Sequence, residues 1–221
     1  MGRVRVLEVL LLVVLVLGMF PCACAFASWQ ENGNPICTAA DQQSDQVITS
    51  DGSGGAIIAW SDDRSGYSDV YARRVDASGN VLWTVDGVAI CTLAGHQYNP
   101  GITSDGSGGA IIAWRDQRNG GFNPDDIYAQ RVDGLGNVMW VANGVAICTA
   151  PNTQGPPQLI SDGSGGAIIT WVDGRAVRGD IYAQRVNASG NVLWIANGVG
   201  VCTNDSIQTW PQIASDGAGG L

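Results

Sequence analysis

A long internal repeat limits the folds open to this chain of 221 residues more than any other feature of its sequence. The segment SDGSGGAIIAW at residues 50–60 returns at 104–114 and, with Thr170 in place of one Ala, at 161–171, and it starts again at Ser215. Such self-similarity at a fixed spacing is typical of arrays in which each small unit buries its apolar side against the next copy. We therefore expect the chain to consist of copies of one unit.

The limits of the units follow from Trp29, Trp83, Trp140 and Trp194, which are spaced 54, 57 and 54 residues apart. Counted from these residues, the units span 29–82, 83–139, 140–193 and, in part, 194–221. Because the sequence breaks off inside a hairpin of the last unit, we expect a truncated piece of a longer repeat protein, whose further units are partners of this one.

Alternating apolar residues and glycine-rich turns predict strands, and the repeated part has no helical apolar stripe. In the second unit the strands are expected at 102–104, 110–114, 127–132 and 138–140, with turns at 105–109 and 133–137. The apolar residues after Asn143-Gly144 fit either a bulge in the last strand or a fifth strand joined by a hairpin. Each unit is thus predicted to be a four-stranded antiparallel meander.

The sequence Asp126-Ile127-Tyr128-Ala129, with Gly136-Asn137 and Trp140 downstream, resembles the repeat of secreted bacterial β-propeller proteins, including seven-bladed repeats. It is also similar to the blades of quinoprotein-dehydrogenase-like propellers. The resemblance covers the chain from Trp29 onward and implies an all-β fold of propeller blades. A ring of about 4 to 8 blades needs more residues than this chain has, so we expect an incomplete ring with exposed edges.

The N-terminus predicts secretion. Arg3 and Arg5 precede an uncharged apolar run at 9–20, and Ala25-Phe26-Ala27 has the small residues that a signal peptidase accepts. A membrane anchor is the alternative, but the run is shorter than the roughly 20 residues that span a bilayer. We therefore expect a signal peptide at 1–27, an extracellular or cell-envelope location, and a repeat domain at 28–221 without a transmembrane span.

Composition excludes several classes of function. The formal net charge is −9 and every basic residue is Arg, so nucleic-acid binding, which needs clustered positive charge, is not expected. The cysteines of the repeats could form disulfides or remain buried free thiols. They occupy equivalent strand positions in successive units, which usually lie further apart than a disulfide allows, so free thiols are favoured at Cys37, Cys91, Cys148 and Cys202. No metal site or cofactor is predicted; calcium is the cation that the many Asp residues would suit, but the turns do not match a calcium loop.

Each unit carries the pattern Trp-x-Asp-x-Arg, at Trp60/Asp62/Arg64, Trp114/Asp116/Arg118 and Trp171/Asp173/Arg175. These charges could form a ring that recognises polar or sugar ligands, or they could bridge within each unit and hold a loop in place. Their presence in every unit favours the structural role. The Trp residues of the pattern, and likewise Trp83, Trp140 and Trp194, are predicted to pack in the core or between units.

Ligand contacts are expected where the units differ. The first-to-second and third-to-fourth turns share one end of a meander, whereas the second-to-third loops and the connections between units share the other. Loops of a rigid scaffold carry function, and the variable residues of that other end are His96, Tyr98, Phe122, Arg178 and Trp210. Trp210 lies outside the register of the other Trp residues and is the best candidate for a stacking contact.

No catalytic residue is predicted, because the chain has one His, no Lys and no recurring nucleophile set. The sequence therefore predicts a secreted, non-catalytic repeat module that binds a protein or a glycan, or acts as a scaffold, outside the cell. The alternative is the propeller part of an extracellular carbohydrate-active enzyme, whose chemistry needs only two carboxylates.

Overall fold

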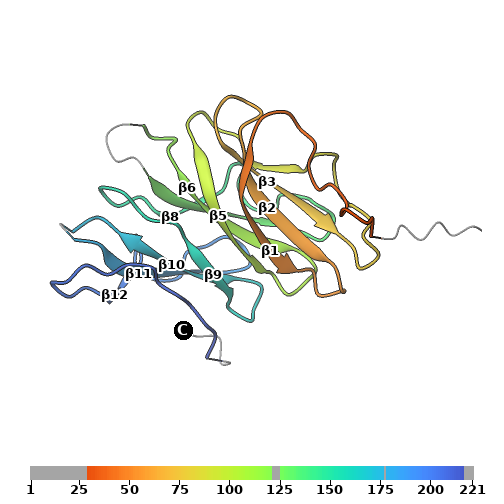
Figure 1. Ribbon diagram of the computed structural model, residues 1–221. Coiled ribbons are helices and arrows are strands. Elements are labelled where there is room, and N and C mark those ends of the chain that lie inside the picture. The colour runs from red at the N-terminus through yellow and green to blue at the C-terminus, as the bar shows by residue number, and fades with distance from the viewer. Residues whose placement is uncertain (1–28, 121–124, 177, 217–221) are drawn as a thin grey trace, which may run out of the picture.

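The computed structural model describes residues 29–120, 125–176 and 178–216, and these residues form three separate four-stranded antiparallel sheets (Figure 1). Each sheet belongs to a repeat of about 54 residues, and none closes into a barrel. The predicted all-β fold of repeating four-stranded meanders is thus confirmed. The predicted signal peptide at 1–27 and the predicted ligand residue Phe122 lie outside the described residues.

Strands follow one another along each sheet in chain order. The first sheet contains β1 (Gln43–Ser50), β2 (Ala56–Asp62), β3 (Asp69–Val75) and β4 (Val88–Cys91). The second contains β5 (Gln97–Ser104), β6 (Ala110–Asp116), β7 (Asp126–Val132) and β8 (Val145–Cys148). The third contains β9 (Gln158–Ser161), β10 (Ala167–Asp173), β11 (Asp180–Val186) and β12 (Val199–Cys202). Across the described ranges, no helix has the length and apolar character needed to cross a membrane.

The repeated Asp-Gly-Ser-Gly-Gly segment is the tight turn between the first and second strands of each sheet. In the first sheet, one carboxylate oxygen of Asp51 accepts the backbone N–H groups of Ser53 and Gly55, both at 2.8 Å. Arg74 on β3 pairs with the other oxygen at 2.8 Å. A Cβ at Gly55 would lie 2.2 Å from a backbone carbonyl oxygen of β3, which explains why only glycine fits there.

The predicted position of the fourth strand is wrong. Val138 forms only an isolated bridge to Val132, and the regular strand is β8, seven residues further along the chain. Both pieces pair with β7, so the fourth strand is one interrupted edge, which agrees with the bulge and not with a fifth strand. Positive φ angles at Asn143 and Gly144 turn the chain out of register, and Gly144 lies directly against the ring of Trp114.

Two apolar clusters join the three sheets face to face. β6 contributes to both, because successive side chains point to opposite faces of a strand: Ile112 belongs to the cluster with the first sheet and Ile111 to the cluster with the third. The first strands also meet, since β5 contacts both β1 and β9. Each sheet therefore hides its apolar side only against its neighbours.

The indoles of Trp83 and Trp140 connect consecutive sheets. Each donates its N–H to a carbonyl oxygen in the third-to-fourth turn of the following sheet, Trp83 to Gly134 at 3.1 Å and Trp140 to Ala188 at 3.0 Å. Both indoles also lie against a glycine of that turn, Gly136 and Gly190 respectively. These Trp residues thus fix the spacing between neighbouring sheets.

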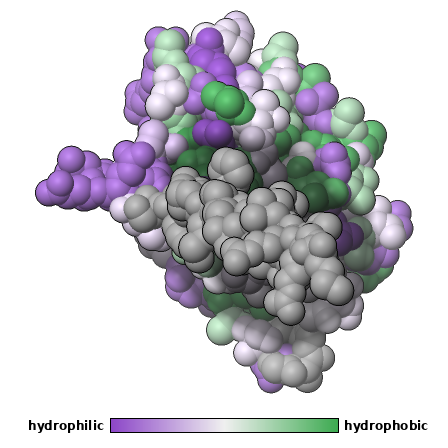
Figure 2. All heavy atoms as spheres, turned by 90° about the vertical axis from the view of Figure 1, so that its right-hand side faces the viewer, coloured by the Kyte–Doolittle hydropathy of each residue, from purple (hydrophilic) through white to green (hydrophobic). Residues whose placement is uncertain are grey.

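The outer side of the first sheet exposes apolar residues. Figure 2 views the molecule from this side, and hydrophobic side chains, drawn in green, reach the surface there. Trp29 is 58% exposed and Ile48 67% exposed, and both line a hollow of about 430 Å³. The equivalent of Ile48 in the second sheet, Ile102, packs against the cluster with the first sheet.

Candidate binding site

The repeated Trp-x-Asp-x-Arg pattern forms the same closed arrangement in every sheet. In the third sheet, Asp173 is fully buried, accepts the indole N–H of Trp171 at 2.8 Å and pairs with Arg175 at 2.7 Å. Arg175 also donates to the backbone carbonyl of Asn197 at 2.6 Å and lies 3.8 Å from the centre of the Tyr182 ring. The corresponding residues of the first two sheets make the same contacts, centred on these pairs: Asp62 with Arg64 and Asp116 with Arg118.

The pKa values of these carboxylates reflect the hydrogen bonds that they accept. Burial disfavours the charged forms of Asp62 and Asp173, but hydrogen bonds from the Arg and Trp of the same pattern outweigh that effect, so the pKa of each lies below its ordinary value. The donors that surround these carboxylates are already committed within the sheet. The arrangement connects the end of the second strand to the interrupted fourth strand.

The four cysteines of the repeats are free thiols, and Cys91 and Cys148 are buried beside this arrangement. Burial raises the pKa of Cys91 to about 11 and that of Cys148 to about 12. Thiolates are the reactive form, and these raised pKa values favour the protonated thiol in both side chains at neutral pH. Within residues 29–120, 125–176 and 178–216, no three His, Cys, Asp or Glu side chains are grouped as metal ligands.

The predicted ligand residues that the structure describes lie in separate surroundings. His96 packs edge-on against Tyr67 at 5.3 Å, and its Nδ1 accepts the backbone N–H of Ser68 at 3.2 Å. Trp210 is 85% exposed and lines an apolar recess of about 250 Å³ together with Val172. The structure therefore does not gather these residues into one site.

Tyr98 belongs to a polar cluster that, among the described residues, forms in the second sheet and not in the other two. Its hydroxyl donates to Asp125 at 2.8 Å, Gln117 donates to the same carboxylate at 2.9 Å, and Arg115 forms an ion pair with it. Burial, and next the hydrogen bond to Asp125, raise the pKa of Tyr98 to about 12. The backbone carbonyl of Asp125 accepts the N–H of Gln154 in the following sheet at 2.9 Å, so this cluster holds a junction between sheets.

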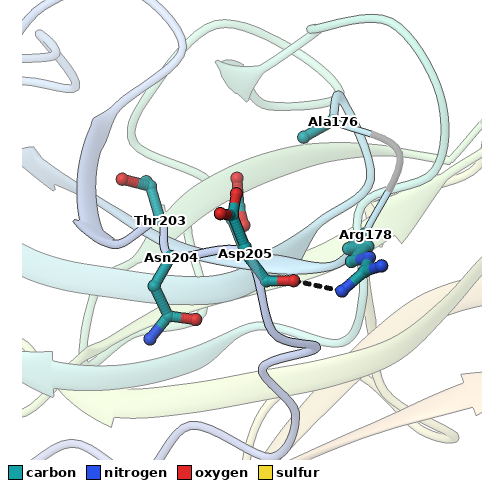
Figure 3. Close-up of a pocket in the computed structure, with 6 residues that line it drawn as sticks. Ala176, Arg178, Thr203, Asn204 and Asp205 are labelled. Atoms are coloured by element: carbon teal, nitrogen blue, oxygen red, sulfur yellow. Dashed lines mark hydrogen bonds between the residues drawn. The ribbon is translucent and has the colours of Figure 1, made fainter.

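Arg178 lines a different feature, a polar pocket of about 410 Å³ in the third sheet (Figure 3). The pocket lies between the β10–β11 loop and the segment that follows β12, and its lining residues are Ala176, Arg178, Asp180, Thr203, Asn204 and Asp205. The guanidinium of Arg178 donates to the backbone carbonyl of Asp205, which joins the two segments (Figure 3).

Asp180 differs in its hydrogen bonding from the equivalent Asp residues of the other two sheets. The equivalent carboxylates are hydrogen-bonded within their own loop: Asp69 accepts the hydroxyl of Ser65 at 2.6 Å, and Asp126 accepts the side-chain amide of Asn119 at 2.7 Å. The loop position that provides Ser65 and Asn119 is occupied in the third sheet by an alanine, Ala176. Asp180 is 7% exposed and pairs with Asp173 through the backbone, but its carboxylate has no hydrogen bond or ion pair among the described residues.

Polar residues also replace apolar ones on the other side of the pocket. Asn204 stands where the first sheet has Leu93 and the second has Ala150, both of which pack against the apolar clusters. Sequence reasoning named Arg178 as a ligand residue but grouped Asp180 with Asp69 and Asp126 as a repeated charge and did not single it out. The signal was present in the sequence, because Ala176 is the one apolar residue at a position that is otherwise Ser or Asn.

Comparison with known proteins does not assign a family. The chain matches no protein-family model and no curated protein sequence. Among solved structures, it is similar at a TM-score of 0.44 and 12% identity to an N-acetylgalactosamine deacetylase from F. plautii in complex with blood group B trisaccharide. The match covers 79% of this chain and 58% of that chain, so the likeness spans less than two thirds of the enzyme.

Proposed function

We propose that this chain is a secreted, non-catalytic binding module built of β-propeller-type blades. Its ligand contacts the loop end, which we define as the end that carries the β2–β3, β6–β7 and β10–β11 loops and the segments after β4, β8 and β12. The repeated charges support this proposal because they are paired inside each sheet, which leaves the unit-specific positions of the loop end for recognition.

The observation that carries the proposal is the Asp180 carboxylate. Asp180 is 7% exposed and its carboxylate has no protein donor among the described residues, so a ligand that donates to it replaces water at a group that is largely buried. In the first two sheets the protein provides the donor itself, from Ser65 and Asn119. In the third sheet the carboxylate lines a pocket whose volume, about 410 Å³, falls in the range of small-ligand sites.

Binding is tested with a panel of immobilised oligosaccharides and peptides, probed with the wild-type chain and with Asp180→Asn. We expect wild-type binding to at least one member and at least a tenfold loss in the variant. Ser107→Ala is the matched control, since Ser107 lies in the β5–β6 turn at the opposite end of the sheets. Absence of binding by the wild-type chain, or an equal loss in both variants, would contradict the proposal.

The same panel tests the absence of catalysis. Incubation with each bound glycan should release no new reducing ends above the level of a heat-inactivated sample. Release that is lost in Asp180→Asn would instead favour the carbohydrate-active enzyme.

Secretion is tested separately by expressing the full chain in a host that has signal peptidase. Sequencing of the exported protein should find Ser28 at its N-terminus. Cell-retained protein that still begins at Met1 would contradict this part of the proposal.

A further inference from the structure

The charges around the Asp180 pocket are not balanced. Two carboxylates line it, the buried Asp180 and the exposed Asp205, and neither side chain has a hydrogen bond or ion pair within the described ranges. The cation among the lining residues is Arg178, and its recorded bond goes to the backbone carbonyl of Asp205, not to a carboxylate. The pocket therefore presents more acceptor capacity than the protein fills.

Burial decides which ligand group suits this pocket best. A charge pair gains strength where water is partly excluded, and Asp180 is more than nine-tenths buried. An ammonium group has one positive charge and three N–H donors, whereas a sugar hydroxyl has one O–H donor and no charge. An ammonium on Asp180 keeps further N–H donors for other acceptors, and Asp205 and the Thr203 hydroxyl, both exposed, line the same pocket.

We propose that the pocket formed by Asp180, Asp205 and Thr203 binds the protonated primary amine of a small ligand, with the ammonium on Asp180. The inference rests on the proposed function and names the chemistry of its ligand. Two sources supply such a group outside cells, an amino sugar and a lysine side chain. The whole chain also attracts cations, because its formal net charge is −9.

Two matched pairs of probes test the charge and identify its source. Glucosamine is compared with glucose, and lysine amide blocked at its α-amine is compared with the same compound acetylated on its side chain. Titration followed by NMR should give at least tenfold tighter binding for one amine than for its uncharged counterpart. The amine that binds identifies the source, and equal binding of charged and uncharged partners overturns the inference.

Substitutions at the pocket test which carboxylate is used. Ala176→Ser places at the third sheet the hydroxyl that Ser65 donates to Asp69, so it should occupy Asp180 and weaken amine binding at least fivefold while the carboxylate remains. Asp180→Asn should weaken it at least tenfold. Ser107→Ala, in the β5–β6 turn at the opposite end of the sheets, is the control and should leave amine binding unchanged. Unfolding curves measured on each variant verify that the fold is retained.

The outcomes separate this inference from the proposed function. If a neutral glycan binds and Asp180→Asn abolishes that binding, but no amine binds, the loop end is a binding site and the amine inference is wrong. If an amine binds and Ala176→Ser has no effect on it, the ammonium is not on Asp180 and the inference is also wrong. If the wild-type chain binds no member of either panel, both proposals fail.

Discussion

In the first sheet, two buried Asp side chains near the loop end differ in their donors and therefore in their pKa. Asp62 is surrounded by donors from Arg64 and Trp60, and its pKa lies below the ordinary value despite its burial. Asp69, which lies seven residues later and pairs with Asp62 across the β2–β3 hairpin, accepts one hydroxyl, and burial raises its pKa. The same residue type therefore serves as a structural anion in one place and as a sparsely satisfied carboxyl in the other.

Replacing Asp173 by Asn should destabilise the fold because it leaves the buried part of Arg175 without its carboxylate. We expect a loss of about 2–4 kcal/mol in the free energy of unfolding at pH 7, measured in urea. The pKa of Asp173 is lowered in the folded state. Its charged carboxylate therefore contributes fully to the free energy of unfolding above the unfolded-state pKa of about 4, and this contribution is lost as the pH falls through the folded-state pKa.

The difference between the wild-type chain and Asp173→Asn should therefore shrink as the pH is lowered below about 4. Glu31→Gln is the control, since Glu31 is exposed and should change the stability little at any pH. A difference that stays constant between pH 7 and pH 3 would show that the effect of the substitution is not due to the charge.

At the scale of the element, an amide side chain completes the interrupted fourth strand. Gln130 is fully buried on β7; its amide nitrogen donates to the carbonyl of Val141 at 2.8 Å, and its oxygen accepts the backbone N–H of Trp140 at 2.9 Å. Gln184 makes the equivalent bonds in the third sheet. In the first sheet Arg73 takes this place and donates to the carbonyl of Leu82 at 3.2 Å. The side chain thus replaces the pairing that the bulge removes.

Gln130→Leu should leave these backbone groups without partners and cost about 2–4 kcal/mol of unfolding free energy. Hydrogen exchange at the amide of Trp140 should accelerate well beyond the change at the amides of β6. Gln42→Leu, at an exposed position, is the control. If exchange at Trp140 is unchanged, the side chain of Gln130 does not hold the bulge.

The junction between sheets depends on the absence of a Cβ at Gly136. Its φ is +90°, and a Cβ would lie 2.9 Å from the indole of Trp83. Gly66 has nearly the same φ, +91°, with open space around it, so Gly66→Ala should cost only the backbone strain of about 1–2 kcal/mol. Gly136→Ala should cost about 1–3 kcal/mol more, measured by urea unfolding. Equal losses in the two variants would mean that the turn moves away from Trp83 without cost.

For the whole molecule, stability is shared along the stack. A sheet whose apolar side is buried only by its neighbours gains most of its stability at the two junctions, as in other repeat arrays. Ile111 and Ile112 are both fully buried, and they lie in different junctions although they are adjacent in sequence. They therefore allow each junction to be weakened separately by the same chemical change.

Ile111→Ala and Ile112→Ala should each reduce the free energy of unfolding by about 2–5 kcal/mol. Each should also lower the melting temperature of all three sheets together. Circular dichroism and tryptophan fluorescence should report the same transition in both variants. Ile48→Ala, at an exposed position on the outer side of the first sheet, is the control. Two separate transitions in either variant would show that the sheets unfold independently.

The repeat, the all-β class and the hairpin turns could all be predicted from the sequence, because these features depend on neighbouring residues. Asp51 and Gly55 close their turn through backbone groups two to four residues away, and alternation along 127–132 reflects the pleat of a single strand. The Trp-x-Asp-x-Arg pattern is equally local, since Asp62 binds Trp60 and Arg64 at a separation of two residues. Such contacts form wherever the strand forms.

Only the tertiary structure decided the features that join distant segments. The fourth strand lies at 145–148 because pairing with β7 is set by the bulge and by the ring of Trp114, not by the apolar residues at 138–140. The Asp180 pocket likewise needs the β10–β11 loop to meet the segment after β12, some 25 residues away. Turn chemistry and alternation are encoded over a few residues, whereas the partners of a buried carboxylate depend on which loops the stacking of the sheets brings together.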